Sequence, residues 1–436
     1  MLVGATLNER GDSAKDVVAF PRRGAEDCIR EPFPLTTFTC GLPPHRRMKI
    51  AQCLEYPIQQ HGGTEVLVRE LIAGLAPRHE IVLVSDDDSH TIRNSPIGTH
   101  IQEHLRWQPE RATLQTSKKL AEDLAQRNLN LAHFHFGGTF GWGSRSPNFS
   151  PPIHLRRQGT PCLATNHGVF GVLEGYIGAQ RSLATKLALL PLAWFSRMQL
   201  ILSLQAEVAV SMADYRALCR RYWPARGRFR QVYHSRIHEN EPVIVLPRKK
   251  IILCAGTIGP RKGQPYLAHA FARIVREFPD WNLVFIGRSG DECTATELNA
   301  IMQRAELHSR ITWIQNCSDA ELRHWFQSVE IFAMPSLHEG LGLTLQEALY
   351  HGCACIASRI GGIPDLIQHG DNGILVERAN VEELADGLGR LMRDGERRHQ
   401  LQARARESVL GKNMTAERMV ARYSQLYAEV LSSHGK

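Results

Sequence analysis

Two carboxylates eight positions apart, Glu339 and Glu347, are the side chains of this sequence best placed to do chemistry. They flank a Gly-x-Gly turn in the segment 335–352, PSLHEGLGLTLQEALYHG. A short apolar run precedes the turn and an Ala/Leu-rich run follows it, which predicts a strand, a turn and a helix at the carboxyl edge of an α/β sheet. Glycines let the backbone approach a ligand, and a helix start favours an anion. Backbone amides that can bind phosphate, together with carboxylates that can bind hydroxyls, suggest a site for a sugar nucleotide.

Glu347 also has a purely structural explanation. Thr344 and Glu347 fit a capping box, in which the glutamate only closes the start of the helix. Glu339 lies in the turn before the helix and has no such explanation. The sequence pattern alone leaves both interpretations of Glu347 open.

The segment HEGLGLTLQEAL resembles the Glu-x7-Glu motif of the retaining glycosyltransferases of family 4, which have the GT-B fold. The similarity extends from about Met48 to the end of the sequence. The resemblance implies an α/β fold of two doubly wound Rossmann-like domains that face each other across a cleft. It also implies a hexosyltransferase-type enzyme that moves a sugar from a nucleotide-sugar donor with retention of configuration.

Length and composition agree with a globular protein of more than one domain. At 436 residues, the chain is longer than the length that a single hydrophobic core ordinarily supports. The hydrophobic (43%) and charged (22%) fractions are typical of soluble domains. The ten cysteines form no CxxC pair, which favours a reduced, cytoplasmic protein. The most apolar run, Leu187–Phe195, is short and broken by Pro191, so we expect a buried helix. Insertion into a membrane interface is the less favoured alternative.

Positive charge is concentrated in the first half of the chain. Residues 1–247 carry 29 basic and 22 acidic side chains, and Tyr215–Arg230 has six arginines and no acid. This segment is either a solvated basic loop or a contact for an anionic acceptor or the inner face of an anionic membrane. Nucleic acid is not an expected partner, because no recognition motif accompanies the arginines.

Apolar runs alternate with helical patterns, which predicts two consecutive parallel sheets. The predicted strands are KIAQCLEY, EIVLVS, LAHFHF, PCLATNH and EVAVS in the first half, and IILCAG, WNLVFIG, RITWIQ, IFAMP, ACIAS and GILV in the second. We expect an N-terminal extension at 1–47, poorly ordered and without a signal peptide, and a first domain at 48–241 for the acceptor. We also hypothesise that translation starts at Met48. A second domain at 248–412 would bind the donor nucleotide. The family resemblance implies that residues 413–436 form a helix that crosses back to the first domain.

Loops at the strand ends of the first domain supply further candidates. Gly62 and Gly63 directly follow the first strand and precede a helix, although a lone Gly-Gly is usually only a turn. They resemble the family's glycine loop, which meets the donor diphosphate and the acceptor. His167 ends the strand PCLATNH. A histidine there is more often structural, but the family has a histidine at this place that contacts the transferred sugar, and we carry that role over.

Lys262 is the candidate phosphate-binding cation. It lies in the segment GTIGPRKG, residues 256–263, which lacks the Gly-Lys-Ser/Thr order of a Walker A loop. The segment resembles the family's Gly-Arg-x-x-x-x-Lys-Gly sequence, with Thr257 in place of the arginine and Arg261 as a compensating cation. A solvated lysine is the structural alternative. The remaining expected donor contacts are Gly287, Ser289, Gly340, Leu341, Gly342, Thr344 and Leu345.

No metal or cofactor is expected beyond the nucleotide sugar, UDP- or GDP-linked. Asp86, Asp87 and Asp88 contain an Asp-x-Asp, but they close a first-domain strand and suit capping or solvation. His133 and His135 share one strand face and lack an evident third ligand.

The expected acceptor is a saccharide, lipid or polymer, whose identity would depend on loops 137–158 and 168–180. Two alternatives stay open: a GT-B epimerase, and a non-catalytic sugar-nucleotide-binding protein that docks on a membrane or polymer.

Overall fold

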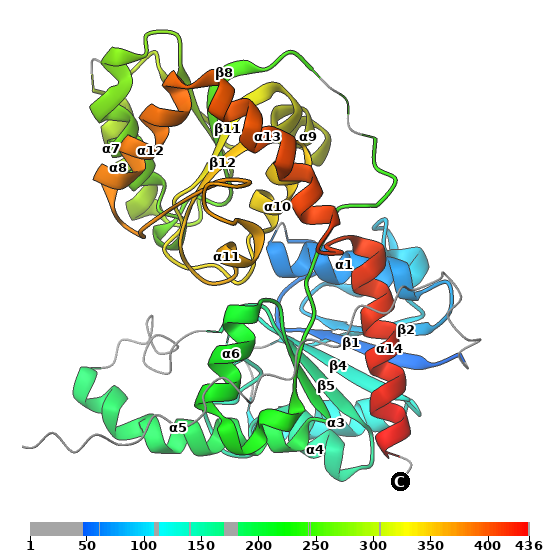
Figure 1. Ribbon diagram of the computed structural model, residues 1–436. Coiled ribbons are helices and arrows are strands. Elements are labelled where there is room, and N and C mark those ends of the chain that lie inside the picture. Colours follow the sequence, from blue (N-terminus) through cyan, green and yellow to red (C-terminus); the bar gives the residue numbers. More distant parts are fainter. Residues whose placement is uncertain are drawn as a thin grey trace, which may run out of the picture. The chain divides into compact units, whose positions relative to one another are not determined.

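The computed structural model describes residues 47–436 apart from 61, 109–112, 139–140, 170–181, 243, 245, 305–306 and 435–436. The predictions made for the N-terminal extension, including a start at Met48, and for the loop 168–180 fall mostly outside these residues. The described chain forms two parallel sheets with helices on both faces (Figure 1).

The first sheet has the order β3-β2-β1-β4-β5-β6-β7, and all its neighbouring strands run parallel. Its strands are β1 Lys49–Leu54, β2 Glu80–Ser85, β3 Glu103–Arg106, β4 Leu131–Phe136, β5 Cys162–Asn166, β6 Ala206–Ala209 and β7 Phe229–Gln231. The helical segments between them are α1 Gly63–Leu75, α2 Ser89–Arg93, η1 Gly98–His100, α3 Leu114–Ala125, α4 Pro151–Arg157, α5 Leu183–Ser203, α6 Met212–Arg221 and η4 Trp223–Arg228.

The second sheet has the order β10-β9-β8-β11-β12-β13 and is also parallel. Its strands are β8 Lys249–Ala255, β9 Asn282–Ile286, β10 Ile311–Ile314, β11 Val329–Met334, β12 Ala354–Ser358 and β13 Ile374–Val376. The helical segments of this half are η5 Pro260–Lys262, α7 Gln264–Ile274, η6 Val275–Glu277, α8 Glu292–Met302, α9 Asp319–Ser328, α10 Leu343–Tyr350, α11 Ile363–Leu366, α12 Val381–Arg393, α13 Gly395–Leu410 and α14 Ala416–His434.

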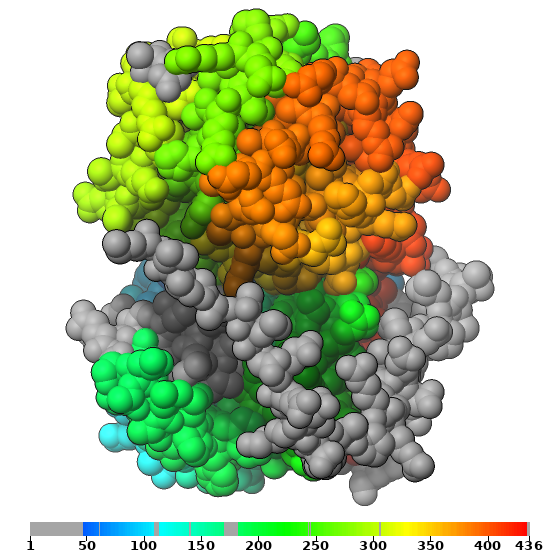
Figure 2. Space-filling model, turned by 60° about the vertical axis from the view of Figure 1, so that its left-hand side comes forward, coloured from blue at the N-terminus to red at the C-terminus, as the bar shows by residue number. Residues whose placement is uncertain are grey.

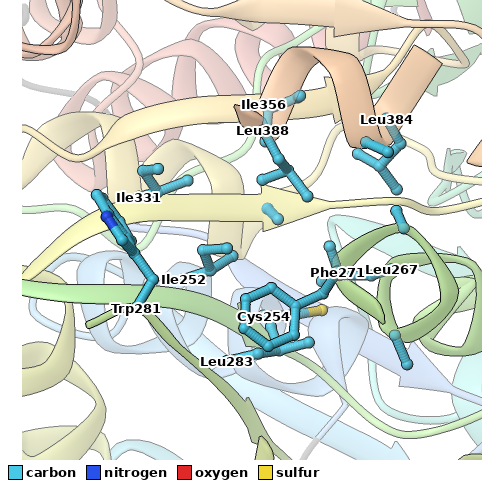
Figure 3. Close-up of a cluster of buried hydrophobic side chains, with 14 of the residues drawn as sticks. Ile252, Cys254, Leu267, Phe271, Trp281, Leu283, Ile331, Ile356, Leu384 and Leu388 are labelled. Carbon is cyan, nitrogen blue, oxygen red and sulfur yellow. The ribbon is translucent and has the colours of Figure 1, made fainter. Parts of the chain in front are cut away.

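Burial on both faces explains the composition of the strands. The buried stretches of strands β8, β9, β11 and β12 are almost wholly apolar, because helices cover both sides of a parallel sheet. On one face of the second sheet, Trp281, Phe271 and Leu283 pack with Leu384 and Leu388 of α12 (Figure 3).

Strand order reverses next to the first strand of each sheet. Strand β1 lies between β2 and β4, and β8 lies between β9 and β11. In open α/β sheets, ligands bind outside the carboxyl ends of the strands at such a switch point. The loops after β1, β4, β8 and β11 are therefore the loops from which a site should be built.

Helix α14, which follows the second sheet along the chain, completes the core of the first. Five of its buried side chains pack in one cluster with strands β1 and β2 and helix α1, as its amphipathic sequence predicts. These side chains are Met419, Tyr423, Leu426, Tyr427 and Val430.

The prediction that Leu187–Phe195 form a buried helix is wrong. The segment is helical, but Leu187 is 49% and Phe195 58% exposed. Only the C-terminal half of α5 packs on the sheet, through residues such as Met198 and Ile201, and the N-terminal turns project past it (Figure 1). The arginine-rich segment 215–230 is likewise no simple loop, since it spans α6, η4 and β7. Within the described residues, no helix is both long and apolar enough to cross a bilayer.

Two glycines of α12 provide a test of the packing. A Cβ on Gly387 would lie 2.6 Å from Cδ1 of Ile356, whereas a Cβ on Gly389 would meet no atom within 4 Å. We expect Gly389→Ala to stabilise the fold by up to ~1 kcal/mol through helix propensity. Gly387→Ala should instead destabilise it by ~1–2 kcal/mol, because the fully buried Ile356 must move. Both variants replace a glycine of α12 by alanine, so each is a control for the other. Thermal unfolding measures their difference in stability, and equal melting temperatures would contradict the prediction.

Candidate functional site

A lysine–glutamate ion pair joins the loops after β8 and β11. Lys262 donates from Nζ to Oε1 of Glu339 at 2.5 Å, and the Ser336 hydroxyl donates to the same oxygen at 2.8 Å. The side chain of Glu339 is 11% exposed and that of Lys262 28%. The two residues that the sequence singles out for the transferred sugar and its phosphate therefore lie together at the switch point of the second sheet.

Close backbone packing holds the two loops in place. Gly263 has a left-handed φ of 66°, and a Cβ there would lie 2.2 Å from the carbonyl oxygen of Pro335. The carbonyl of Arg261 accepts from the backbone N–H of Leu337 at 2.7 Å. Glycine is thus required at position 263 for the approach that brings Lys262 to Glu339.

Charge around Glu339 favours its ionised form. Burial raises the pKa of this carboxyl, but the Lys262 ammonium and the hydrogen bonds from Lys262 and Ser336 outweigh it, so the pKa lies below its ordinary value of 4.5. The guanidinium of Arg261 acts in the same direction. Arg261 is therefore close enough to act on Glu339 electrostatically.

Residues of the first sheet reach the same place. A Cβ on Gly340 would lie 2.3 Å from the carbonyl oxygen of His167. Nearby, the backbone N–H of Met212 donates to Oδ2 of Asp365 at 2.7 Å. His167, at the end of β5, and the Glu339–Gly340 turn, after β11, are therefore adjacent.

Buried hydrogen bonds determine which nitrogen of His167 carries the proton. Gln52 donates from Nε2 to the Tyr427 hydroxyl at 3.1 Å, so its Oε1 accepts from Nε2 of His135 at 2.9 Å. Burial lowers the pKa of His135 well below its ordinary value, so this ring is neutral and its Nδ1 is an acceptor. That Nδ1 lies 3.2 Å from Nε2 of His167, which must then be the protonated nitrogen.

The same network continues to helix α14 and back. The Tyr427 hydroxyl lies 2.8 Å from Nδ1 of His133, whose Nε2 lies 2.7 Å from Oγ1 of Thr165. Tyr423 then joins Thr165 to Nε2 of His234, each at 2.7 Å. His133 and His135 are therefore engaged in hydrogen bonds within the protein.

The glycine loop of the first sheet carries an acid that the sequence analysis missed. Helix α1 begins at Gly63, with Gly62 as its N-cap. A Cβ on Gly62 would lie 2.0 Å from Oε2 of Glu65, so this carboxylate covers the loop that was expected to meet the diphosphate. Burial raises the pKa of Glu65, while Arg69 and Arg288 oppose the shift.

The loops after β8 and β9 pack directly on each other. A Cβ on Gly287 would lie 2.2 Å from the carbonyl oxygen of Gly256, and one on Gly290 would lie 2.4 Å from Cγ2 of Thr257. Ser289 pairs with Ile258 through a parallel bridge. Thr257, Gly287 and Ser289 are thus neighbours, as their expected common role at the donor requires.

The start of α10 has free amides, and Glu347 does not cap it. The N-cap is Gly342, with a φ of 94° and no side-chain hydrogen bond, so the capping-box alternative for Thr344 and Glu347 is wrong. Leu341 and Leu345 are buried in the core, so only their backbone atoms could contact a donor.

Glu347 binds an arginine that the sequence analysis did not consider. Nε of Arg236 lies 2.6 Å from Oε1 of Glu347, and Nη1 of Arg236 lies 3.2 Å from Asp319. Burial raises the pKa of Glu347 despite Arg236. These three residues line a cavity of about 370 Å³ together with Glu70, His238 and Glu241.

The acidic triplet is occupied by structural contacts. Asp88 caps α2 by accepting from the backbone N–H of His90 at 3.0 Å, Asp87 accepts from Ile58 N–H at 2.6 Å, and Asp86 pairs with Arg106. Across the residues that the structure describes, no three His, Cys, Asp or Glu side chains are grouped as a metal site.

Glu55, one residue past the end of β1, is a further candidate that the sequence analysis missed. Burial raises its pKa to about 7, against the backbone N–H of Trp142 and the charge of Arg145. Only packing reveals such a shift, because a glutamate after a strand carries no distinctive pattern. Arg236 and Glu65 escaped notice for the same reason.

Two family models cover most of the chain. The model for Glycosyltransferase Family 4 matches residues 61–235, and that for Glycosyl transferases group 1 matches residues 237–408. The chain contains both glycosyltransferase domains. Among curated proteins, N-acetyl-alpha-D-glucosaminyl L-malate synthase of Bacillus anthracis is 32% identical over 42% of this chain and 46% of its own length. The chain thus matches about half the length of such relatives.

Solved structures of other proteins share the fold. Sucrose-phosphate synthase from Thermosynechococcus elongatus aligns with a TM-score of 0.68 at 19% identity, over 89% of this chain and 100% of that one. An Anabaena protein in complex with UDP and glucose aligns with a TM-score of 0.64 at 17% identity, over 88% and 100%. The predicted GT-B fold of two Rossmann-like domains is confirmed.

The Lys262–Glu339 pair predicts a specific pH dependence of stability. In the wild type the pKa of Glu339 is lower in the folded state than its ordinary value. The ionised carboxyl therefore adds to the free energy of unfolding above the ordinary pKa, and this stabilisation is lost as the pH falls through the folded pKa. In the Lys262→Met variant the ammonium is absent, so burial of Glu339 dominates and raises the pKa of its carboxyl. The variant therefore loses stability relative to the wild type as the pH rises. We expect a deficit of ~2 kcal/mol, or a Tm lower by ~5 °C, at about pH 7.5 and a smaller deficit at about pH 5.

Lys250→Met is the matched control for this measurement. Lys250 pairs with Asp280 at 2.7 Å, but both side chains are more than half exposed. Calorimetry should show little change at either pH. A deficit of Lys262→Met that is the same at both pH values would contradict the assigned charge state of Glu339.

Proposed function

We propose that the protein transfers a sugar from a nucleotide-sugar donor to a saccharide, lipid or polymer acceptor. The observation that carries the proposal is the contact between Lys262 and Glu339 beside the carbonyl of His167. A cation for phosphate and a carboxylate for hydroxyls meet there, at the switch point of a nucleotide-binding type of sheet.

Breaking the bond between sugar and phosphate leaves negative charge on the departing diphosphate. Lys262, the uncapped amides at the start of α10 and the nearby Arg261 supply fixed positive potential for that charge. Lys262 pairs with the Glu339 carboxylate in the structure. A bound donor would draw the ammonium to its phosphate and leave the Glu339 carboxylate to accept from sugar hydroxyls.

In the proposed transfer, the acceptor oxygen forms the new bond to the anomeric carbon as the diphosphate leaves with the electron pair. The proton of the acceptor hydroxyl passes to the departing phosphate oxygen. Retention of configuration and attack from the front face follow from the family resemblance and are part of the proposal.

His167 would bind the transferred sugar as a neutral imidazole. Burial lowers its pKa to about 3, so it carries no charge at neutral pH. With its Nε2 proton directed to His135, its Nδ1 can accept a hydrogen bond from a sugar hydroxyl.

The remaining donor contacts are assigned to backbone and to Glu347. Gly62, Gly63, Gly287 and Ser289 would meet the diphosphate or nucleotide. Glu347 would bind the ribose through Oε2, which accepts no hydrogen bond from the described residues, while Oε1 keeps its bond with Arg236.

We further propose that catalysis uses no metal ion or other cofactor, and that the protein acts in the cytoplasm or at the inner face of the membrane. The Anabaena protein of the same fold is described with UDP and glucose, which makes UDP-sugars the first donors to test, followed by GDP-sugars.

Two substitutions test the roles of the central pair. Glu339→Gln and Lys262→Ala should each lower turnover well over tenfold, because a lost charged contact in a dry site costs ~2.7–4 kcal/mol. Release of nucleoside diphosphate, measured with each purified variant, gives the rates. Lys250→Ala is the control, because Lys250 forms an exposed ion pair with Asp280 and lies on β8, the strand that precedes the Lys262 loop. Wild-type turnover in either site variant would refute its role.

A donor screen identifies the base and tests the metal proposal. Thermal-shift measurements with UDP-, GDP- and ADP-sugars should show stabilisation shared by sugars of a single base, and ~2.7 kcal/mol of stabilisation is expected at a hundred times the Kd. Transfer with that donor should persist in EDTA. Loss of transfer in EDTA that returns with Mn²⁺ or Mg²⁺ would overturn metal independence, and donor epimerisation without transfer would favour the epimerase.

A further inference from the structure

An apolar stripe projects from the first domain along the N-terminal half of α5. Leu183, Leu187 and Phe195 are 65%, 49% and 58% exposed, and Leu202 continues the stripe further along the helix. Their spacings of four, eight and seven residues place them on one side of an α-helix. Figure 2 shows these turns, coloured blue-green, as a projection at the surface. An exposed apolar stripe of this extent marks an interaction surface.

The beginning of η4 extends this stripe with an aromatic residue. Nε1 of Trp194 lies 3.4 Å from the carbonyl oxygen of Arg221, and the rings of Trp194 and Tyr222 stack at 6.5 Å between centroids. This contact fixes η4 beside α5. Trp223 follows at once and is 69% exposed.

The same region presents cations and no exposed carboxylate. Between residues 182 and 230, the sequence has only two acids, Glu207 and Asp214, and both are buried. Arg216, Arg220 and Arg226 are exposed on α6 and η4. The surface therefore combines apolar side chains, a tryptophan and positive charge.

We propose that α5 and η4 form a docking surface for an anionic lipid bilayer, on which the protein lies without spanning it. The apolar stripe enters the boundary between headgroups and acyl chains, Trp223 lies at the headgroup level, and the arginines contact lipid phosphates. Such a position would bring the proposed enzyme to acceptors carried by the membrane.

Charge and composition together favour a bilayer over other occupants. A second copy of the chain on this surface would oppose arginine to arginine, with no exposed carboxylate between residues 182 and 230 to pair with them. A nucleic acid would match the charge but leave the apolar stripe in water. A bilayer with anionic headgroups satisfies both parts of the surface.

Vesicle flotation of the full chain tests this surface. The protein should float with vesicles of equal parts phosphatidylcholine and phosphatidylglycerol and remain unbound with phosphatidylcholine alone. The double variant Leu187→Glu, Phe195→Glu should lose ~tenfold or more in binding, because two apolar anchors become anionic. Arg220→Glu, Arg226→Glu should weaken binding comparably and reduce its dependence on salt.

Leu410→Glu is the matched control, since Leu410 is a leucine 36% exposed at the end of α13 in the second domain. It should bind vesicles like the wild type. Circular dichroism melting of every variant separates loss of docking from loss of folding, and donor-induced thermal shifts report separately on the proposed catalytic site.

Three results would overturn the docking surface. These are no binding by the wild type to anionic vesicles, equal binding by the α5 double variant and the Leu410→Glu control, and self-association on gel filtration that only the α5 variant loses. Vesicle binding by a protein without transfer activity would contradict the proposed function and support the docking surface. Transfer activity without vesicle binding would contradict the docking surface and support the proposed function.

Discussion

The contact between Lys262 and Glu339 is the interaction on which the carboxyl edge of the second sheet depends. A carboxylate that is only 11% exposed needs a partner, because burial of an unpaired charge is strongly unfavourable. Glycine at 263 and at 361 allows the loops to close, since a Cβ at either position would lie within 2.2 Å of a backbone oxygen. Under the proposed function, the same pair also supplies opposite charges for the two halves of a sugar phosphate. If the proposed function holds, stability and ligand recognition depend on one interaction.

The buried histidines connect this edge to helix α14. Tyr423 and Tyr427 donate to and accept from a network that ends at His167, which lies against Gly340. Each side chain is hydrogen-bonded to the next, although Nδ1 of His234 has no partner among the described residues. Polar groups that are paired in this way are tolerated in a core. The orientation of the imidazole at the site thus depends on side chains more than 250 positions away in the sequence.

Much of this architecture could be predicted, because repeated apolar strands and glycine turns are local signals. All six strands of the second sheet and five of the seven in the first follow from the pattern. Strands β3 and β7 were missed, since they are short edge strands with polar residues such as Glu103 and Arg230. Glu339 and Lys262 were found through their motifs, whereas Arg236 and Glu65 were not, because their roles arise from packing between distant segments. The exposure of α5 was missed because an apolar helix has the same sequence pattern whether it faces a core or projects from it.

The position of α14 along the chain has a consequence for biosynthesis. Five of its buried side chains belong to the core of the first domain, yet the ribosome must make the whole second domain before they emerge. Until then, strands β1 and β2 and helix α1 lack part of their hydrophobic cover. The first domain should therefore remain incompletely folded and accessible to chaperones until α14 is made. A truncation before residue 416 should lower the solubility of the first domain more than that of the second domain.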